Sequence, residues 1–263
     1  MKEPDLKLIV KEKYSKIFMQ KHSCCNTSGC CGELEFSMIG DEYKNIEGYH
    51  PDADLGLGCG IPTQFAAIKM GDHVLDLGSG AGNDCFVARA IVGETGTVTG
   101  LDFTDAMLAK AIENNHTLGF NNVEFIKGDI EEMPFPDNSF DVIVSNCVLN
   151  LVPDKNKAFA QIMRVLKPNG HFCLSDVVIK NSLPEALRKD AEMYAGCVSG
   201  AINLIEYLGI VNKQGFKNIT VHKQKEIDIP AEVLENYLSK EEITSFKNSD
   251  SGIFSITISG YKM

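Results

Sequence analysis

The feature that most constrains the fold of this chain is a short apolar strand that runs into a glycine-rich turn. Residues 74–82 read Val-Leu-Asp-Leu-Gly-Ser-Gly-Ala-Gly. The three glycines allow the backbone to turn sharply and to approach a ligand closely. A helix pattern follows at residues 84–92. Such a strand, turn and helix predict the first unit of an open α/β sheet that binds its ligand at the carboxyl ends of the strands.

The following residues alternate between strand and helix patterns. Further strands are expected at 97–102, 123–126, 140–145 and 171–179, and helices at 105–115, with Thr104 as N-cap, and at 155–166, ending at Lys167-Pro-Asn-Gly170. This alternation predicts a doubly wound, mostly parallel sheet. Later helices are expected at about 184–197 and 203–213, and late strands at 219–222 and 253–261 suggest an antiparallel edge pair.

The chain is long enough for one sizeable core with appendages. We expect an N-terminal helix (about 3–18) and a cysteine-rich stretch within residues 1–60, a Rossmann-like cofactor-binding core at 61–180, and lid helices with the final strand pair at 181–263. No run of about 18 apolar residues occurs, so no membrane-spanning helix is expected. The charged N-terminus lacks the apolar core of a signal peptide, which predicts a cytoplasmic protein.

The net charge of −11 disfavours nucleic-acid backbones and anionic membranes as partners but tolerates a cationic ligand. Two acids are candidates for binding such a ligand. Asp102 ends the second strand about 20 residues past the glycines, where an acid binds ribose hydroxyls. Asp129 follows the third strand, near the expected place of an adenine. Both acids could instead be turn or cap residues. The third glycine of the dinucleotide fingerprint is replaced by Asn83, which argues against NAD.

Nine cysteines are many for a reducing compartment, and their odd number excludes complete pairing. Three of them have ligand-like contexts: Gly-Cys-Gly at Cys59, Asn-Cys-Val at Cys147 and Gly-Cys-Val at Cys197. Thiolates select soft, thiophilic centres. The alternative for each of these three is an inert, buried core cysteine. We favour that interpretation for two other cysteines, Cys85 and Cys173.

Two vicinal pairs, Cys24-Cys25 and Cys30-Cys31, lie in a turn-rich stretch. They could bind structural zinc, capture a metalloid, form a disulfide during turnover, or have no role. The six histidines are scattered without ligand spacing, so no metal cofactor is expected.

Four motifs together resemble the class I S-adenosylmethionine-dependent methyltransferases: residues 74–82, Gly-Leu-Asp at 100–102, Gly-Asp-Ile at 128–130, and Phe-Asp-Val-Ile-Val-Ser-Asn at 140–146. The resemblance implies a seven-stranded sheet whose last two strands form an antiparallel hairpin. It also implies the cofactor-binding residues Asp76, Gly78, Ser79, Gly80, Gly82, Asp102, Met107, Asp129, Ile130 and Asn146.

The wider cysteine contexts at 55–62, 82–86, 145–151 and 195–201, with the N-terminal pairs, are similar to the arsenite methyltransferases. The resemblance implies that Cys59, Cys147 and Cys197 each supply one arsenic-binding thiolate, with a cellular thiol such as glutathione as reducing co-substrate. Arsenic(III) held by three thiolates keeps a lone pair that can attack a methyl group, and no general base is needed. The expected function is arsenite methylation in arsenic detoxification. Two alternatives stay open, namely a methyltransferase for a small organic acceptor and a non-catalytic thiol-based sensor of a metalloid or zinc.

Overall fold

The computed structural model describes residues 7–8, 10–12, 43–189, 200–229 and 231–263. Its central feature is a seven-stranded sheet with the order β3-β2-β1-β4-β5-β7-β6. The strands are β1 (His73–Leu77), β2 (Thr97–Asp102), β3 (Val123–Lys127), β4 (Phe140–Asn146), β5 (Leu166–Lys180), β6 (Lys217–Ile227) and β7 (Gly252–Tyr261). The first five pair in parallel, and β7 runs antiparallel to both β5 and β6. The predicted mostly parallel, doubly wound sheet is confirmed.

The last two strands form the expected antiparallel pair, but a long connection joins them. Residues 228–251 separate them and contain helices α8 (Ala231–Leu234) and α9 (Lys240–Lys247). Of the pair, only β6 lies at the edge, because β7 is inserted between β5 and β6. A signal for α9 is present in the sequence, since Ser239 and Glu242 form a capping box in which each side chain accepts a backbone N–H.

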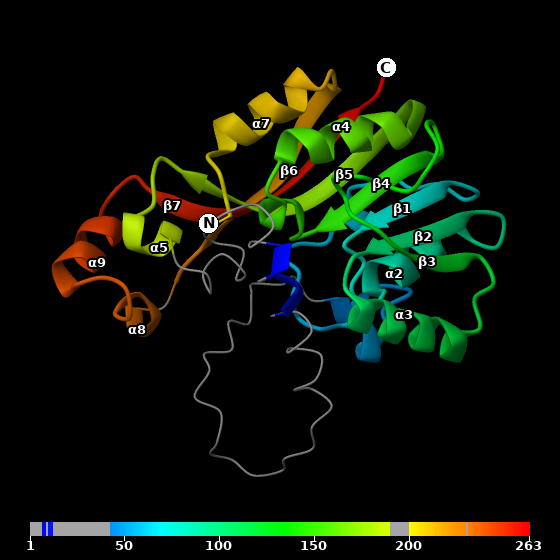
Figure 1. Ribbon diagram of the computed structural model, residues 1–263, viewed down its shortest axis with the longest axis horizontal. Helices are drawn as coiled ribbons and strands as arrows, with labels where there is room; N and C mark the ends of the chain where they lie inside the picture. The colour runs from blue at the N-terminus through cyan, green and yellow to red at the C-terminus, as the bar shows by residue number, and fades with distance from the viewer. Residues whose placement is uncertain (1–6, 9, 13–42, 190–199, 230) are drawn as a thin grey trace, which may run out of the picture.

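Helices cover both faces of the sheet (Figure 1). Helices α2 (Asn83–Val92) and α3 (Asp105–Leu118) lie on one face, and α4 (Lys155–Val165) and α7 (Leu204–Lys213) on the other. The alternation of strand side chains explains both layers, because Val74 packs in the core under α2, whereas Leu75 and Leu77 pack in the core under α4 and α7.

Several boundaries differ from those expected. Helix α4 ends at Val165 and β5 begins at the next residue, so the Lys-Pro-Asn-Gly stretch lies in the strand. Thr104 occupies the N-cap position of α3, but its side chain makes no capping hydrogen bond; its N–H donates to Asp102 Oδ1 over 2.8 Å. Much of the helices expected at 3–18 and 184–197 lies outside the described residues. The described parts are helical at 7–8, 10–12 and in α5 (Glu185–Lys189).

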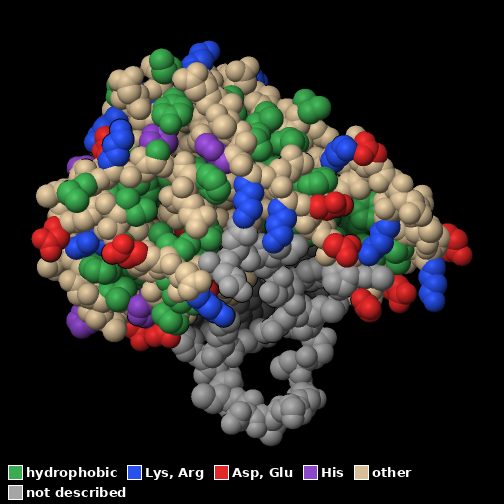
Figure 2. All heavy atoms as spheres, turned by 180° about the vertical axis from the view of Figure 1, so that it is seen from behind, with side chains coloured by type: hydrophobic (Ala, Val, Ile, Leu, Met, Phe, Trp, Pro, Cys, Tyr) green, Lys and Arg blue, Asp and Glu red, His purple; other side chains and the backbone are tan. Residues whose placement is uncertain are grey.

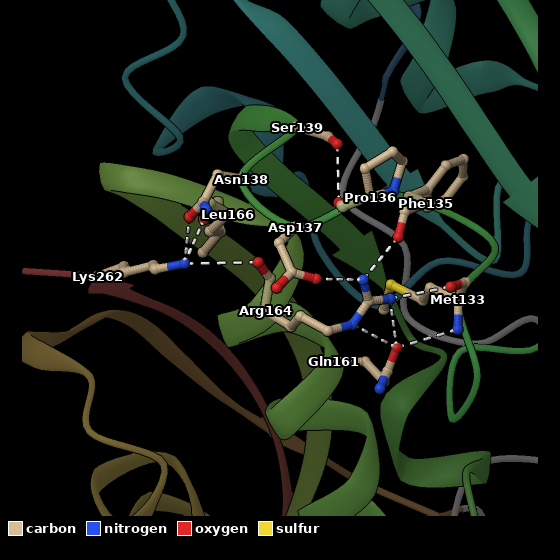
Figure 3. A network of polar contacts seen from close by, with 10 residues as sticks. All are labelled: Met133, Phe135, Pro136, Asp137, Asn138, Ser139, Gln161, Arg164, Leu166 and Lys262. Atoms are coloured by element: carbon tan, nitrogen blue, oxygen red, sulfur yellow. Dashed lines mark hydrogen bonds and ion pairs between the residues drawn. The ribbon is translucent and has the colours of Figure 1, made fainter.

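The connection between β3 and β4 is held by side chains from α4 and from the end of β7 (Figure 3). Arg164 donates to the carbonyl oxygens of Phe135 over 2.6 Å and of Met133 over 3.0 Å. Lys262 donates to Asn138 Oδ1 over 2.8 Å. These bonds fix the loop that begins at the carboxyl end of β3, beside the ligand edge of the sheet.

A second, smaller hydrophobic core lies where β5 and β7 extend beyond the rest of the sheet. Residues of α5, α8 and α9 pack there against the two strands, at the left end of Figure 1. Its members include Cys59, Cys147, Leu151, Val177, Leu187, Leu234, Ile243 and Ile253. Two of the predicted ligand cysteines are therefore embedded in an apolar cluster.

The surface is mixed in charge. On the face drawn in Figure 2, acidic and basic side chains are interspersed among apolar and polar ones. None of the helices in the described ranges has the length and apolarity needed to span a bilayer.

Candidate active site

A pocket opens at the carboxyl ends of the parallel strands, where the predicted ligand edge lies. It holds about 940 Å³ of empty space, which includes solvent at its open mouth. The loops after β1, β2, β3 and β4 line it, together with residues near 53–58, Tyr43 and Val10.

Eight of the ten predicted cofactor-binding residues line this pocket: Asp76, Gly78, Ser79, Gly80, Asp102, Met107, Ile130 and Asn146. Gly82 does not, and its positive φ of 97° at the start of α2, with the rings of Phe86 and Phe125 within 3.0 Å of a would-be Cβ, gives it a structural reason to be glycine. Asp129 is also outside the lining, and its carboxylate accepts from Lys7 Nζ over 2.6 Å.

The glycine-rich turn is shaped by its contacts with the neighbouring strands. A Cβ on Gly78 would lie 2.5 Å from Val148, so only glycine fits there. Asp102 stabilises the turn directly, because its carboxylate accepts from the backbone N–H of Gly80 over 3.0 Å as well as from Thr104. The acid predicted to bind a ribose therefore also orders the loop beside it.

The pocket is acidic. Its described lining contains Asp54, Asp76, Asp84 and Asp102 and no lysine, arginine or histidine. Burial, reinforced by the charge of Asp84, raises the pKa of Asp76 well above its usual range. Burial likewise raises the pKa of Asp84 to about 6, although hydrogen bonds from Tyr43 and Asn146 oppose the shift. Such a pocket disfavours phosphate groups and favours a cation.

Tyr43 and Asp84 form a buried cluster with Asn146 that sequence reasoning missed. The Tyr43 hydroxyl donates to Asp84 Oδ1 over 2.8 Å. The Asn146 amide donates to Tyr43 Oη over 2.8 Å, to the Gly60 carbonyl over 2.8 Å and to Asp84 Oδ2 over 3.2 Å. Asp84 falls within the 82–86 motif, so the sequence offered a signal, but nothing around Tyr43 marked it as part of a site.

The same cluster positions one of the predicted thiol ligands. Asn146 Oδ1 accepts from the backbone N–H of Cys59 over 3.0 Å. The flanking glycines allow close approach, since a Cβ on Gly58 would lie 2.6 Å from the Asn146 amide and one on Gly60 would lie 2.5 Å from Ser175 Oγ. The Cys59 loop thus lies flat against the ends of β4 and β5.

Cys147 follows Asn146 at the point where β4 ends. Its φ of +61° lies in the left-handed region, which is uncommon for residues other than glycine. Its backbone N–H donates to the carbonyl oxygen of Ser175 over 2.7 Å. Both Cys59 and Cys147 are 2% exposed and belong to the same apolar cluster, and Cys147 also lines the pocket. The structure therefore brings these two predicted ligands together beside the pocket. Cys197 and the four N-terminal cysteines lie outside the described residues.

Cys85 and Cys173 are buried core residues, as expected. The Cys85 thiol donates to Asp76 Oδ2 over 3.3 Å, and burial raises its pKa well above the usual range. Burial raises the pKa of Cys173 to about 12. Both therefore stay protonated at neutral pH and are poor ligands or nucleophiles.

Two polar atoms of the pocket are available to bind a ligand with hydrogen-bonding groups. Ser79 Oγ and Asn83 Oδ1 are buried, and neither has a hydrogen-bond partner among the described residues. Buried polar atoms of this kind are costly unless a ligand or water satisfies them. With the acidic lining, they fit a cationic, hydroxyl-rich and amine-bearing molecule such as S-adenosylmethionine.

The sheet order, the glycine-rich turn and the pocket at the carboxyl ends of the strands define a class I methyltransferase fold. The sequence model of a family described as "Methyltransferase domain" matches residues 68–243, more than half of the chain. The chain belongs to this family.

Several relatives carry a more specific name. The chain is 39% identical over 230 residues to the arsenite methyltransferase of Halobacterium salinarum, covering 83% of this chain and 59% of that protein. It is 41% identical over 152 residues to the arsenite methyltransferase of Homo sapiens, covering 54% of this chain and 40% of that protein. Among solved structures, the arsenic(III) S-adenosylmethionine methyltransferase of Chlamydomonas reinhardtii is 35% identical with a TM-score of 0.63, covering 75% of this chain and 65% of that one.

The chain spans about three fifths of the length of the first two curated relatives, 59% and 64%. Over about half of its length it is also 40% identical to a ubiquinone/menaquinone biosynthesis C-methyltransferase from Psychromonas ingrahamii. Identity of this degree over half of the chain therefore does not define the methyl acceptor.

Proposed function

We propose that this protein transfers a methyl group from S-adenosylmethionine to arsenic(III) held by the thiolates of Cys59, Cys147 and Cys197, in detoxification of arsenic. The observation that carries the proposal is the convergence of Cys59 and Cys147, 88 positions apart in the sequence, in one apolar cluster beside an acidic pocket. The similarity to arsenite methyltransferases over 83% of the chain supports it.

The pocket residues have distinct roles toward the cofactor in this proposal. Asp102 accepts hydrogen bonds from the ribose, while Gly78, Ser79 and Gly80 let the backbone approach the ligand. Asp84, whose pKa of about 6 leaves it ionised at neutral pH, supplies negative charge that complements a cation, and Asp76 lines the pocket beside it. Met107 and Ile130 supply apolar contacts. When bound, S-adenosylmethionine would supply an electrophilic methyl group on its sulfonium sulfur. The arsenic lone pair would attack that methyl carbon as the carbon–sulfur bond breaks with its electron pair on sulfur, which leaves a neutral thioether.

The apolar surroundings of the thiols suit arsenic. Three thiolates neutralise arsenic(III), so the bound centre carries no net charge and can lie in an apolar cluster at little desolvation cost. The chain then needs to hold the acceptor in line with the methyl group, at roughly 3 to 3.5 Å between reacting atoms. No residue of the two described thiol loops is needed as a general base, because the nucleophilic lone pair carries no proton.

The reaction also needs a reductant. Methylation raises arsenic formally from +3 to +5, and a return to +3 consumes two electrons. We assign these to a pair of thiols that becomes a disulfide, either a cellular thiol such as glutathione or a pair among Cys24, Cys25, Cys30 and Cys31. A cytoplasmic location, where thiols are kept reduced, fits this requirement.

One rival function has a specific observation in its favour. The 40% identity to a quinone C-methyltransferase over 133 residues is compatible with an organic acceptor. Such an acceptor has a proton to lose, which calls for a base. The buried acids of the described pocket, Asp76 and Asp84, are the candidates, and this function would leave Cys59 and Cys147 dispensable.

The decisive experiment uses Cys147→Ser and Cys59→Ser, with Cys173→Ser as a matched control in the sheet core. Each protein is incubated with methyl-labelled S-adenosylmethionine, arsenite and glutathione, and labelled arsenic species are separated chromatographically. We expect methylated arsenic from wild type and the control, and none from the two ligand variants, which should retain cofactor affinity. Full activity in both ligand variants would remove the basis of the proposal, and wild-type binding of arsenite without turnover would favour a sensor.

A further inference from the structure

A second buried polar network lies outside the cofactor pocket, on the other side of the Cys147 turn. Its members are Asn150, Lys155, Asp176 and Tyr207, and none of them lines the pocket. Each is at most 8% exposed, and Asn150 and Tyr207 are fully buried. A buried acid, base and phenol in one place require a reason, because burying charged and polar groups is costly unless they are satisfied.

The carboxylate of Asp176 accepts hydrogen bonds from backbone N–H groups, one of which belongs to the turn after Cys147. Its Oδ1 accepts from the N–H of Asn150 over 3.3 Å and from its own neighbour Val177 over 2.9 Å, and its Oδ2 accepts from the Tyr207 hydroxyl over 2.9 Å. Asn150 is the central residue of the short helical turn η4 (Leu149–Leu151), which begins two residues after Cys147. Asp176 therefore connects β5 and α7 to the segment that carries the thiol.

Lys155 binds backbone carbonyl oxygens of the same turn. Its ammonium group donates to the carbonyl oxygens of Asn150 over 3.1 Å and Val152 over 3.2 Å. Burial lowers the pKa of Lys155, and the charge of Asp176 opposes that shift. The carboxylate of Asp176 thus binds the N–H of Asn150, and the ammonium group of Lys155 binds the carbonyl oxygens of Asn150 and Val152. These bonds restrict the backbone of the turn.

The phenol of Tyr207 connects α7 to this network through Asp176. Burial and the charge of Asp176 raise the pKa of Tyr207 well above its usual range, so the hydroxyl stays neutral and keeps its hydrogen bond to the carboxylate.

We propose that Asp176, Tyr207 and Lys155 are positioning residues that hold the left-handed Cys147 turn in the conformation needed to capture arsenic(III). They act on the affinity for the acceptor and leave the affinity for the cofactor unchanged. This inference rests on the proposed function, and it adds to it a set of residues on β5, α4 and α7 that touch neither the cofactor pocket nor the acceptor.

The test compares Tyr207→Phe and Asp176→Asn with Tyr261→Phe, which makes the same chemical change at the end of β7, away from the turn. Binding of sodium arsenite is measured by equilibrium dialysis with elemental quantification of arsenic. Cofactor binding is measured by titration calorimetry, and folding by the thermal transition. Kinetics with arsenite and glutathione give kcat and KM separately.

We expect Tyr207→Phe to weaken arsenite binding about tenfold, because a hydrogen bond to a buried charge is lost and the turn is loosened. KM for arsenite should rise by a similar factor, while kcat at saturating arsenite and the cofactor affinity stay within about twofold. Asp176→Asn should have at least as large an effect where it folds, and Tyr261→Phe should match wild type.

Two results would overturn the inference. One is arsenite binding by a folded Tyr207→Phe variant that equals wild type. The other is a parallel loss of arsenite and cofactor affinity, which would mean a general structural role. Failure of the proposed function gives a different pattern, because wild-type protein itself would then neither bind nor methylate arsenite.

Discussion

Replacing Gly60 with alanine tests whether the position of the Cys59 loop governs acceptor chemistry. A Cβ at this position would lie 2.5 Å from Ser175 Oγ, 2.8 Å from Ser175 Cβ and 3.3 Å from Thr257 Oγ1. Contacts under 3.0 Å are essentially never seen for real Cβ atoms, so the loop or the strand must retreat by about half an ångström. Ser175 is buried and hydrogen-bonded to Thr257 over 2.8 Å, so we expect the loop, which carries the thiol, to move.

The expected cost follows from that displacement. Overpacking of this kind destabilises a protein by roughly 1–3 kcal/mol. Because a misplacement of about 1 Å can cost on the order of a hundredfold in rate, a shift of half that size should lower kcat/KM for arsenite about tenfold. Gly209→Ala on α7 is the matched control, since a Cβ there meets nothing within 4 Å and should raise stability by about 0.5–1 kcal/mol.

The assay combines arsenite methylation kinetics, calorimetric titration with the cofactor, and thermal unfolding. A second variant, Gly60→Ala with Ser175→Gly, removes both of the short contacts and should recover part of the lost kcat/KM. The reasoning is refuted if Gly60→Ala retains kcat/KM for arsenite within about twofold of wild type, or if cofactor affinity falls as much as activity.

Three further predictions follow from the charges and contacts described. Asp84→Asn should stabilise the cofactor-free protein by about 2–3 kcal/mol at pH 8, because the raised pKa of about 6 means that the stability of the wild-type protein falls as the pH rises from about 4 to 6. Urea unfolding should show no such gain near pH 4. Titration calorimetry should show weaker cofactor binding. Arg164→Met should lower the free energy of unfolding by about 2–3 kcal/mol, measured by urea denaturation, because two carbonyls and Asp137 lose their charged donor. Zinc should displace arsenite poorly in competition dialysis, because three thiolates around Zn²⁺ leave a net negative charge in an apolar cluster; equal competition would contradict the neutral-centre argument.

The architecture of the cofactor half could be predicted because its signals are local. The second strand was expected at 97–102 and is found at Thr97–Asp102, and the third and fourth strands differ from expectation by one residue at their carboxyl ends. Apolar runs bounded by glycines determine such strands regardless of what packs on them. The late antiparallel strand pair was also predicted, but the two helices between its strands were not. The capping signal at Ser239 was readable, but whether helices intervene between two antiparallel strands depends on a distant surface for them to cover.

The site was predictable only in part. Residues of the glycine turn and strand ends follow from the sheet topology, which brings the carboxyl ends of parallel strands to one edge. The hydrogen bonds of Asn146 to the Cys59 loop, and the buried acid of Asp84 beneath it, depend on contacts between segments 62 and 87 positions apart. The hydrophobic periodicity of the sequence does not predict contacts between such distant segments. Cys147 was assigned by its motif, but its left-handed backbone became visible only with the turn in place.

In the proposed reaction, this arrangement would place a charged methyl donor beside a neutral acceptor. Asn146 faces the acidic, hydrogen-bonded pocket, and the next residue, Cys147, packs in the apolar cluster. The positive φ at Cys147 ends β4 at this point and directs the chain into the turn held by Asp176. Val10, Cys147 and Leu151 belong to both the pocket lining and the apolar cluster, so these side chains separate the two environments. The acidic pocket stabilises a cation, whereas the apolar cluster disfavours one. A soft, uncharged centre bound at the thiols could therefore contact the donor without entering the acidic pocket.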